Sequence, residues 1–222
     1  MDTSTAFSTG SLSLDTALGR GGYPRGRIIE VGGPRGSGKT TLALQAIAEV
    51  QRVGGVAALI DTDHVFNRQT AESIGVDCGK LLVSQPDDFS QAFDIIEALL
   101  RSCAVELIVV NSAAALLPKS AGASEVDDEG YRSRLLHQAF NKFCVLAGRY
   151  NVTLLVIHQH DATNPVSTET RVSGVVFRYY SSIRIDVRRI GEDINSGEVV
   201  TGHRERIKVL KNKFSAPFCD TV

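Results

Sequence analysis

The chain has 222 residues, 43% of them hydrophobic and 22% charged, with a formal net charge of −1. This length suits one substantial domain with a buried core. A near-neutral balance excludes a global pull toward nucleic acid or an anionic membrane, although a local basic patch remains compatible with it. No apolar run approaches the roughly 20 residues that span a bilayer, and the first residues do not resemble a signal peptide. Four widely spaced cysteines favour reduced thiols over disulfides, so we expect a cytoplasmic protein.

Short runs of branched apolar residues alternate with longer stretches of helical periodicity. We predict strands at 27–33, 56–61, 81–85, 106–111 and 152–158, and helices at 39–53, 88–102 and 131–149. Strands that are apolar almost throughout are typical of a sheet covered on both faces. The pattern therefore predicts an α/β fold, a mainly parallel twisted sheet with helices on both faces.

The C-terminal part of the chain follows a different pattern. Residues 181–190 and 204–212 alternate between apolar and polar side chains, with a polar stretch between them. This predicts an antiparallel hairpin at one edge of the sheet. Two further segments, 117–130 and 160–174, are polar and turn-rich and follow predicted strands. Loops of that length are either functional or simple surface connections, and both alternatives stay open.

A glycine-rich segment, GPRGSGKT, lies between the first predicted strand and the first predicted helix. This order of strand, loop and helix is the context in which a GxxxxGK[ST] motif indicates a phosphate-binding loop. Backbone N–H groups would surround the phosphates, Lys39 would reach the β- and γ-phosphates, and the hydroxyl of Thr40 would face Mg²⁺. The predicted nucleotide-binding residues are Gly33, Pro34, Arg35, Gly36, Ser37, Gly38, Lys39, Thr40 and Thr41. The motif does not by itself specify hydrolysis.

Around that loop the chain resembles the bacterial RecA recombinase family. The resemblance is carried by STGSLSLDTALGRGGYPRGRIIEVGGPRGSGKTTLALQ, LIDTDH, ELIVVNSAAALLPK, FRYYSSIRIDVRRIG and IKVLKNKFSAPF. It implies a single RecA-type ATPase core over residues 1–222, with ATP and Mg²⁺ as cofactors. It also implies a protein that polymerises on single-stranded DNA and exchanges strands.

The resemblance assigns roles to several residues outside the loop. Gln159 matches the glutamine that senses the γ-phosphate and signals to the DNA-binding loop behind it. Lys211 and Lys213 match lysines that a neighbouring subunit extends into the ATP site. Cations supplied in this way neutralise charge on the transferring phosphoryl group, so hydrolysis would depend on assembly.

Three residues depart from the family pattern in the reaction centre. Asn111 stands where an aspartate faces the magnesium ion, so its amide would hold a metal-bound water without a negative charge. Asp63 stands where a glutamate activates water, and one methylene fewer withdraws the carboxylate by roughly 1–1.5 Å, enough to cost on the order of 10²-fold in rate. Thr70 replaces the tyrosine that stacks on adenine.

The DNA-facing part of the pattern is also altered. Asn141 and Asp161 replace arginines, and phosphate-tracking surfaces draw their affinity from Lys and Arg. We therefore expect weak binding of single-stranded DNA. The remaining candidate DNA contacts are Lys119, Arg134, Arg171 and Arg178.

The ends of the chain bear on assembly. The family places a polymerisation arm before the segment that begins here at Ser8, and a small domain after the core. Both are absent from this sequence, so we expect impaired self-assembly, whether the chain is natural or a trimmed piece of a longer protein.

These features lead to two main hypotheses, with ATPase activity left open. The first is a divergent accessory protein of DNA repair or damage tolerance, with slow or absent ATP hydrolysis, that docks on a recombinase filament or a DNA polymerase. The alternative is an active ATP-dependent recombinase that exchanges strands on single-stranded DNA. A nucleotide-gated protein unrelated to DNA is a third reading, because fold does not dictate function.

Overall fold

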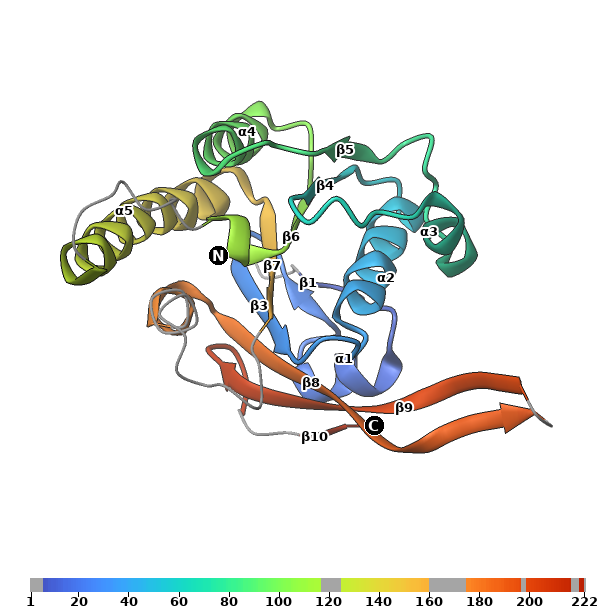
Figure 1. Ribbon diagram of the computed structural model, residues 1–222. Coiled ribbons are helices and arrows are strands. Elements are labelled where there is room, and N and C mark those ends of the chain that lie inside the picture. The colour runs from blue at the N-terminus through green and yellow to red at the C-terminus, as the bar shows by residue number, and fades with distance from the viewer. Residues whose placement is uncertain (1–5, 117–124, 160–174, 197–198, 217–219, 222) are drawn as a thin grey trace.

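The computed structural model describes residues 6–116, 125–159, 175–196, 199–216 and 220–221. Its main strands are β3 (Ile28–Gly33), β4 (Ala57–Asp61), β5 (Leu82–Ser84), β6 (Leu107–Asn111), β7 (Thr153–Gln159), β8 (Ile183–Ser196), β9 (Val199–Asn212) and β10 (Asp220–Thr221). They form one sheet in the order β10-β9-β8-β3-β7-β6-β4-β5 (Figure 1). Neighbouring strands from β8 to β5 run parallel, whereas β9 runs antiparallel to β8 and to β10. The α/β class with a C-terminal antiparallel hairpin is confirmed.

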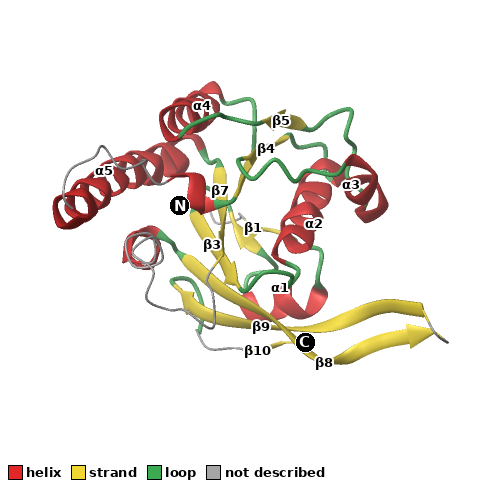
Figure 2. Cartoon of the chain, viewed as in Figure 1, coloured by secondary structure: helices red, strands yellow, loops and turns green. Residues whose placement is uncertain are grey.

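Helices cover both faces of this sheet (Figure 2). Their bounds are α1 (Leu12–Leu18), α2 (Lys39–Arg52), α3 (Arg68–Ile74), α4 (Phe89–Ser102), the short 3₁₀ helix η1 (Ala113–Leu116) and α5 (Glu125–Tyr150). Alternate residues of each strand serve the two faces. In β6, Val109 packs with α1, α2 and α3, while Ile108 and Val110 pack with α4, η1 and α5. This explains why the buried strands are apolar almost throughout.

Helices α1 and α3 were not predicted, because they are too short to show a clear hydrophobic periodicity. Both α1 and α3 begin at a side-chain cap, since Ser11 accepts from the backbone of Leu14 and Asn67 accepts from that of Thr70. Each helix ends at a glycine in the left-handed region, a common stop signal. Caps rather than hydrophobic periodicity therefore define these helices. A separate pair of two-residue strands, β1 (Ala6–Phe7) and β2 (Tyr23–Pro24), flanks α1.

The structure corrects two boundaries. Helix α5 begins at Glu125 rather than at residue 131, so the end of the unassigned segment 117–130 is helical. The hairpin is longer than predicted, because β8 continues to Ser196 and β9 begins at Val199. Backbone pairing, with shifts in register, extends both strands into the polar stretch. The two paired strands reach beyond the rest of the sheet (Figure 1). Residues 175–180 are helical, whereas 117–124 and 160–174 lie outside the described residues.

Within the described residues, no helix is both long and apolar enough to cross a lipid bilayer.

Candidate nucleotide-binding site

The phosphate loop connects β3 to α2 at the carboxyl edge of the sheet, where the sequence placed it. Its glycines are needed where another strand approaches closely. A Cβ on Gly33 would lie 2.3 Å from the carbonyl oxygen of Val187 on β8. Gly38 is the N-cap of α2 and has a φ of 79°, which side chains rarely adopt. The loop therefore presents the N-terminus of α2, whose free N–H groups and dipole favour phosphate.

Lys39 is folded back over this loop. Its ammonium group donates to the carbonyl oxygen of Pro34 at 2.5 Å and to the hydroxyl of Ser37 at 3.4 Å, and the residue is 7% exposed. Burial lowers the pKa of Lys39, and the guanidinium of Arg35 acts in the same direction. From this position the ammonium group can turn to contact the β- and γ-phosphates once a nucleotide enters the loop.

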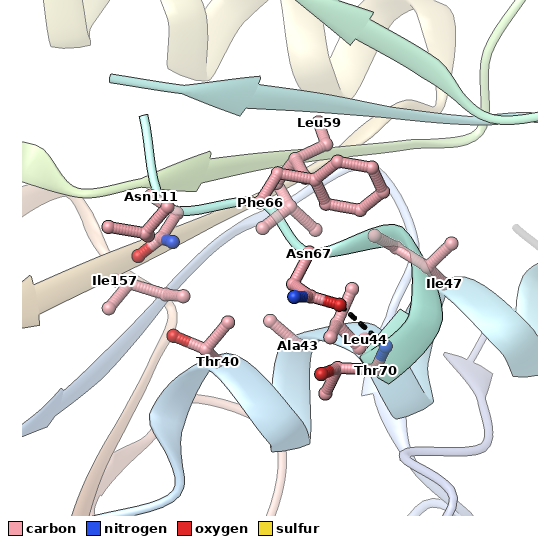
Figure 3. A pocket seen from close by; sticks show the side chains of 12 residues that line it. Thr40, Ala43, Leu44, Ile47, Leu59, Phe66, Asn67, Thr70, Asn111 and Ile157 are labelled. Carbon is pink, nitrogen blue, oxygen red and sulfur yellow. Dashed lines mark hydrogen bonds between the residues drawn. The ribbon is translucent and has the colours of Figure 1, made fainter. Parts of the chain in front are cut away.

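A cavity of about 170 Å³ adjoins the first turn of α2 (Figure 3). Its walls come from α2, from β4, β6 and β7, and from α3 with the segment that precedes it. They are lined by Thr40, Ala43, Leu44, Ile47, Leu59, Val65, Phe66, Asn67, Thr70, Val109, Asn111 and Ile157. Thr70 lies at this cavity with its small side chain.

Thr40 and Asn111 line that same cavity, and Asn111 is buried at the end of β6. Hydroxyl and amide oxygens are the hard ligands that suit Mg²⁺. Among the described residues, no group of three or more His, Cys, Asp or Glu side chains could hold a metal by itself. Thr40 and Asn111 therefore fit a magnesium ion that takes its other ligands from water and nucleotide phosphates.

Asp63 follows β4 and is tied to the end of β6. The hydroxyl of Ser112 donates to the Asp63 carboxylate at 3.2 Å, and the backbone N–H groups of Thr62 and Asp63 donate to the carbonyl oxygen of Asn111 at 2.8 and 3.3 Å. The hydroxyl of Thr62 also donates to the carbonyl oxygen of Ser112 at 2.9 Å. These bonds place the expected water-orienting carboxylate beside the expected magnesium-side amide.

The anchor of this loop, Asp61, was missed by the sequence analysis. Its fully buried carboxylate accepts from the backbone N–H groups of Val65 at 3.3 Å and Phe66 at 3.0 Å, and from the side chain of Gln85 at 2.9 Å. A carboxylate as the last residue of an apolar strand was the available signal. The segment that carries Asp63 is thus held at both ends.

Gln159 ends β7, and its register partner is Gly33 at the start of the phosphate loop. The parallel register therefore brings Gln159 beside the loop. Lys211 makes its contacts inside its own chain, since its ammonium donates to the carbonyl oxygens of Arg178 at 2.6 Å and Tyr179 at 3.4 Å. The side chain of Lys213 is exposed.

Of the candidate DNA contacts, Arg134 and Arg178 are exposed on neighbouring elements. Arg134 lies on α5, where its Nε donates to the carbonyl oxygen of Gly130 at 3.2 Å. His137, one turn further along α5, contacts the rings of Tyr179 and Tyr180 at 6.3 and 5.6 Å between centroids, so residues 175–180 pack beside this helix. Lys119, Arg171 and Asp161 lie outside the described residues.

A parallel α/β sheet with this loop, followed by polar side chains at the ends of β4, β6 and β7, defines a phosphate-loop nucleotide-binding protein. The RecA N-terminal domain family matches residues 2–222, and the chain belongs to the RecA family. Membership implies ATP binding.

Curated relatives agree with this placement. The chain is 47% identical over 218 residues to Protein RecA of Chlorobaculum parvum, covering 96% of this chain and 62% of that protein. It is 47% identical over 216 residues to Protein RecA of Bordetella avium, covering 95% and 61%. For Protein RecA of Desulforapulum autotrophicum the identity is 46% over 217 residues, covering 96% and 62%. The chain thus spans about three fifths of the length of these relatives.

Proposed function

We propose that this chain is the catalytic core of an ATP-dependent DNA recombinase of the RecA family, working in the cytoplasm. In this proposal it binds ATP with Mg²⁺, assembles on single-stranded DNA and couples hydrolysis to that assembly. The observation that carries the proposal is the convergence of four strand ends. The phosphate loop after β3, Asp63 after β4, Asn111 ending β6 and Gln159 ending β7 share one edge of the sheet. Hydrogen bonds join the ends of β4 and β6, and strand register brings Gln159 beside Gly33.

The proposed roles follow from position. Residues 33–41 hold the phosphates, and Thr40 holds Mg²⁺ together with Asn111, which acts through a metal-bound water. The ion would neutralise charge on the β- and γ-phosphates. Asp63 would orient the attacking water, and Gln159 would respond to the γ-phosphate. Lys211 and Lys213 would act in the site of a neighbouring subunit.

DNA binding is proposed for the surface next to residues 175–180. Arg134 and Arg178 support it because both are exposed on elements that pack together. Lys119 and Arg171 lie outside the described residues and stay candidate DNA contacts on the resemblance alone. Two arginines and their neighbours provide few phosphate contacts, so we expect weak and strongly salt-dependent binding.

A second candidate function is favoured by one observation, the amide of Asn111 beside the short carboxylate of Asp63. With less negative charge next to Thr40 and a withdrawn base, the chain would bind ATP but turn it over slowly. It would then act as a nucleotide-dependent accessory that docks on a recombinase filament or a DNA polymerase.

Steady-state ATP turnover with and without saturating single-stranded DNA, at low salt, tests the proposal. DNA-stimulated turnover that disappears in Lys39→Ala would support the recombinase. Tight ATP binding without turnover in either condition would favour the accessory function. A chain that neither binds nor hydrolyses ATP would contradict both.

A further inference from the structure

A carboxylate from the C-terminal hairpin rests on the phosphate loop. A Cβ built on Gly38 would lie 1.9 Å from Oε1 and 2.3 Å from Oε2 of Glu205, a residue of β9. The Glu205 carboxylate is therefore packed directly against the backbone at the N-cap of α2. A negative charge in that place cancels part of the positive electrostatic potential with which the loop attracts phosphate.

The hairpin holds this carboxylate in position. His203 lies two residues earlier on β9, so it shares a face with Glu205, and its Nε2 is 3.1 Å from Oε1. The imidazole neutralises the carboxylate only when it is protonated. The side chain of Glu205 is 24% exposed, so solvent screens its charge only in part.

A second hairpin carboxylate, Asp186 on β8, also affects Lys39 but has a cationic partner. Its Oδ2 accepts from Nε of Arg188 at 2.7 Å. Both Asp186 and Glu205 raise the pKa of Lys39, whereas Arg35 lowers it. Glu205 is the one of the two that lies against the loop backbone, which makes it the carboxylate that an incoming phosphate would meet.

We propose that Glu205 is a specificity-determining residue of the nucleotide site, whose negative charge weakens nucleotide binding in proportion to the charge of the phosphate chain. It discriminates against a triphosphate more than against a diphosphate, because the triphosphate carries one more negative charge. At the effective dielectric constant of a protein surface, a like charge several ångströms away changes a binding constant by roughly tenfold. This inference rests on ATP binding as proposed above, but not on hydrolysis or on DNA.

The test is the dissociation constant of Mg-ATP and of Mg-ADP, measured by calorimetry on the full chain. Glu205→Gln keeps the shape of the side chain and removes its charge. We expect Mg-ATP to bind about tenfold more tightly, Mg-ADP to gain less, and both gains to shrink at about 0.5 M salt. Asp94→Asn is the matched control, since it removes one exposed carboxylate from α4 on the opposite side of the sheet, and should change neither constant.

Glu205→Asp adds a second variant that keeps the charge and withdraws it from Gly38, so its affinity should lie between those of the other two proteins. If the wild type binds Mg-ATP and Glu205→Gln binds it equally tightly or more weakly, the inference is overturned. Glu205 would then have only a structural role at the start of α2. Equal gains for Mg-ATP and Mg-ADP would overturn the discrimination. If neither wild type nor Glu205→Gln bound Mg-ATP, the proposed function would fail together with the inference.

Discussion

The ammonium nitrogen of Lys211 lies 2.6 Å from the carbonyl oxygen of Arg178, and this bond ties β9 to the last turn of the helical residues 175–180. A cation at the C-terminal end of a helix stabilises its free carbonyl groups. To act in the ATP site of a neighbouring subunit, Lys211 would have to leave these carbonyls. Any such movement would also free the helix that follows the segment 160–174.

Lys211→Ala is therefore expected to have two effects. Loss of the helix cap should lower the free energy of unfolding by about 1 kcal/mol, measured by urea denaturation. Loss of the cation should reduce DNA-stimulated ATP turnover by on the order of 10²-fold or more. Lys213→Ala, at an exposed side chain, should reduce turnover while leaving stability unchanged. Lower stability with full turnover in Lys211→Ala would restrict Lys211 to a structural role.

Asp61 should control turnover without touching the nucleotide. Asp61→Ala leaves the N–H groups of Val65 and Phe66 and the amide of Gln85 without their acceptor, so we expect a loss of about 2–4 kcal/mol in the free energy of unfolding. In Asp61→Asn, which keeps one acceptor oxygen, ATP turnover should fall while the affinity for ATP changes little, because only the Asp63 segment is loosened. Unaltered turnover in a folded Asp61→Asn protein would show that this anchor does not position Asp63.

Glu30 should make stability depend on acid pH. It is 3% exposed on β3, where it accepts from Nη2 of Arg184 at 3.1 Å and lies 3.4 Å from Nδ1 of His158. Burial alone would raise the pKa of Glu30, but the hydrogen bonds and charges of His158 and Arg184 outweigh it, so the pKa lies below its ordinary value of 4.5. The ionised form is thus favoured by folding. Its contribution is present above pH 4.5 and is lost as the pH falls through the lowered pKa.

Urea denaturation of wild type and Glu30→Gln across this range tests that expectation. The variant leaves Arg184 without its buried anion, so it should be less stable by about 2–4 kcal/mol at about pH 7. The difference should shrink as the pH falls below 4.5 and the wild-type carboxyl becomes protonated. A difference that stays constant with pH would mean that Glu30 acts through packing instead of charge. Glu97→Gln, which removes two surface ion pairs, with Arg101 and Lys142, should show a much smaller effect.

The pair Asn111 and Asp63 decides between the two candidate functions. Asn111→Asp restores a negative charge beside Thr40, and Asp63→Glu extends the carboxylate that Ser112 contacts. We expect the double variant to raise DNA-dependent ATP turnover by roughly tenfold or more, measured against each single variant. No gain would show that these two positions do not limit turnover. If the wild type shows almost no ATP turnover and the double variant gains it, the accessory function would be favoured for the wild type.

The sequence by itself determined the layered α/β class, the strands that form the sheet except the short edge strand β10, and the position of the phosphate loop. These features depend on local patterns: runs of branched apolar residues between helical stretches, and glycines at set spacing between a strand and a helix. Asn111 and Gln159 were placed in the site beforehand by the resemblance to the RecA family, and the structure brings them to the same place because the ends of parallel strands share one edge of the sheet.

Other features were decided only by tertiary structure. Caps at Ser11 and Asn67 start two short helices that carry no clear periodicity, and backbone pairing extends the hairpin through residues that look like a turn. Three contacts join residues that no local pattern relates: the hydrogen bonds of Asp61 to its loop, the bond from Lys211 to Arg178, and the contact of Glu205 with Gly38. Such contacts depend on how the strands are ordered in space and on which side chains then face one another, and periodicity along the chain carries no information about either.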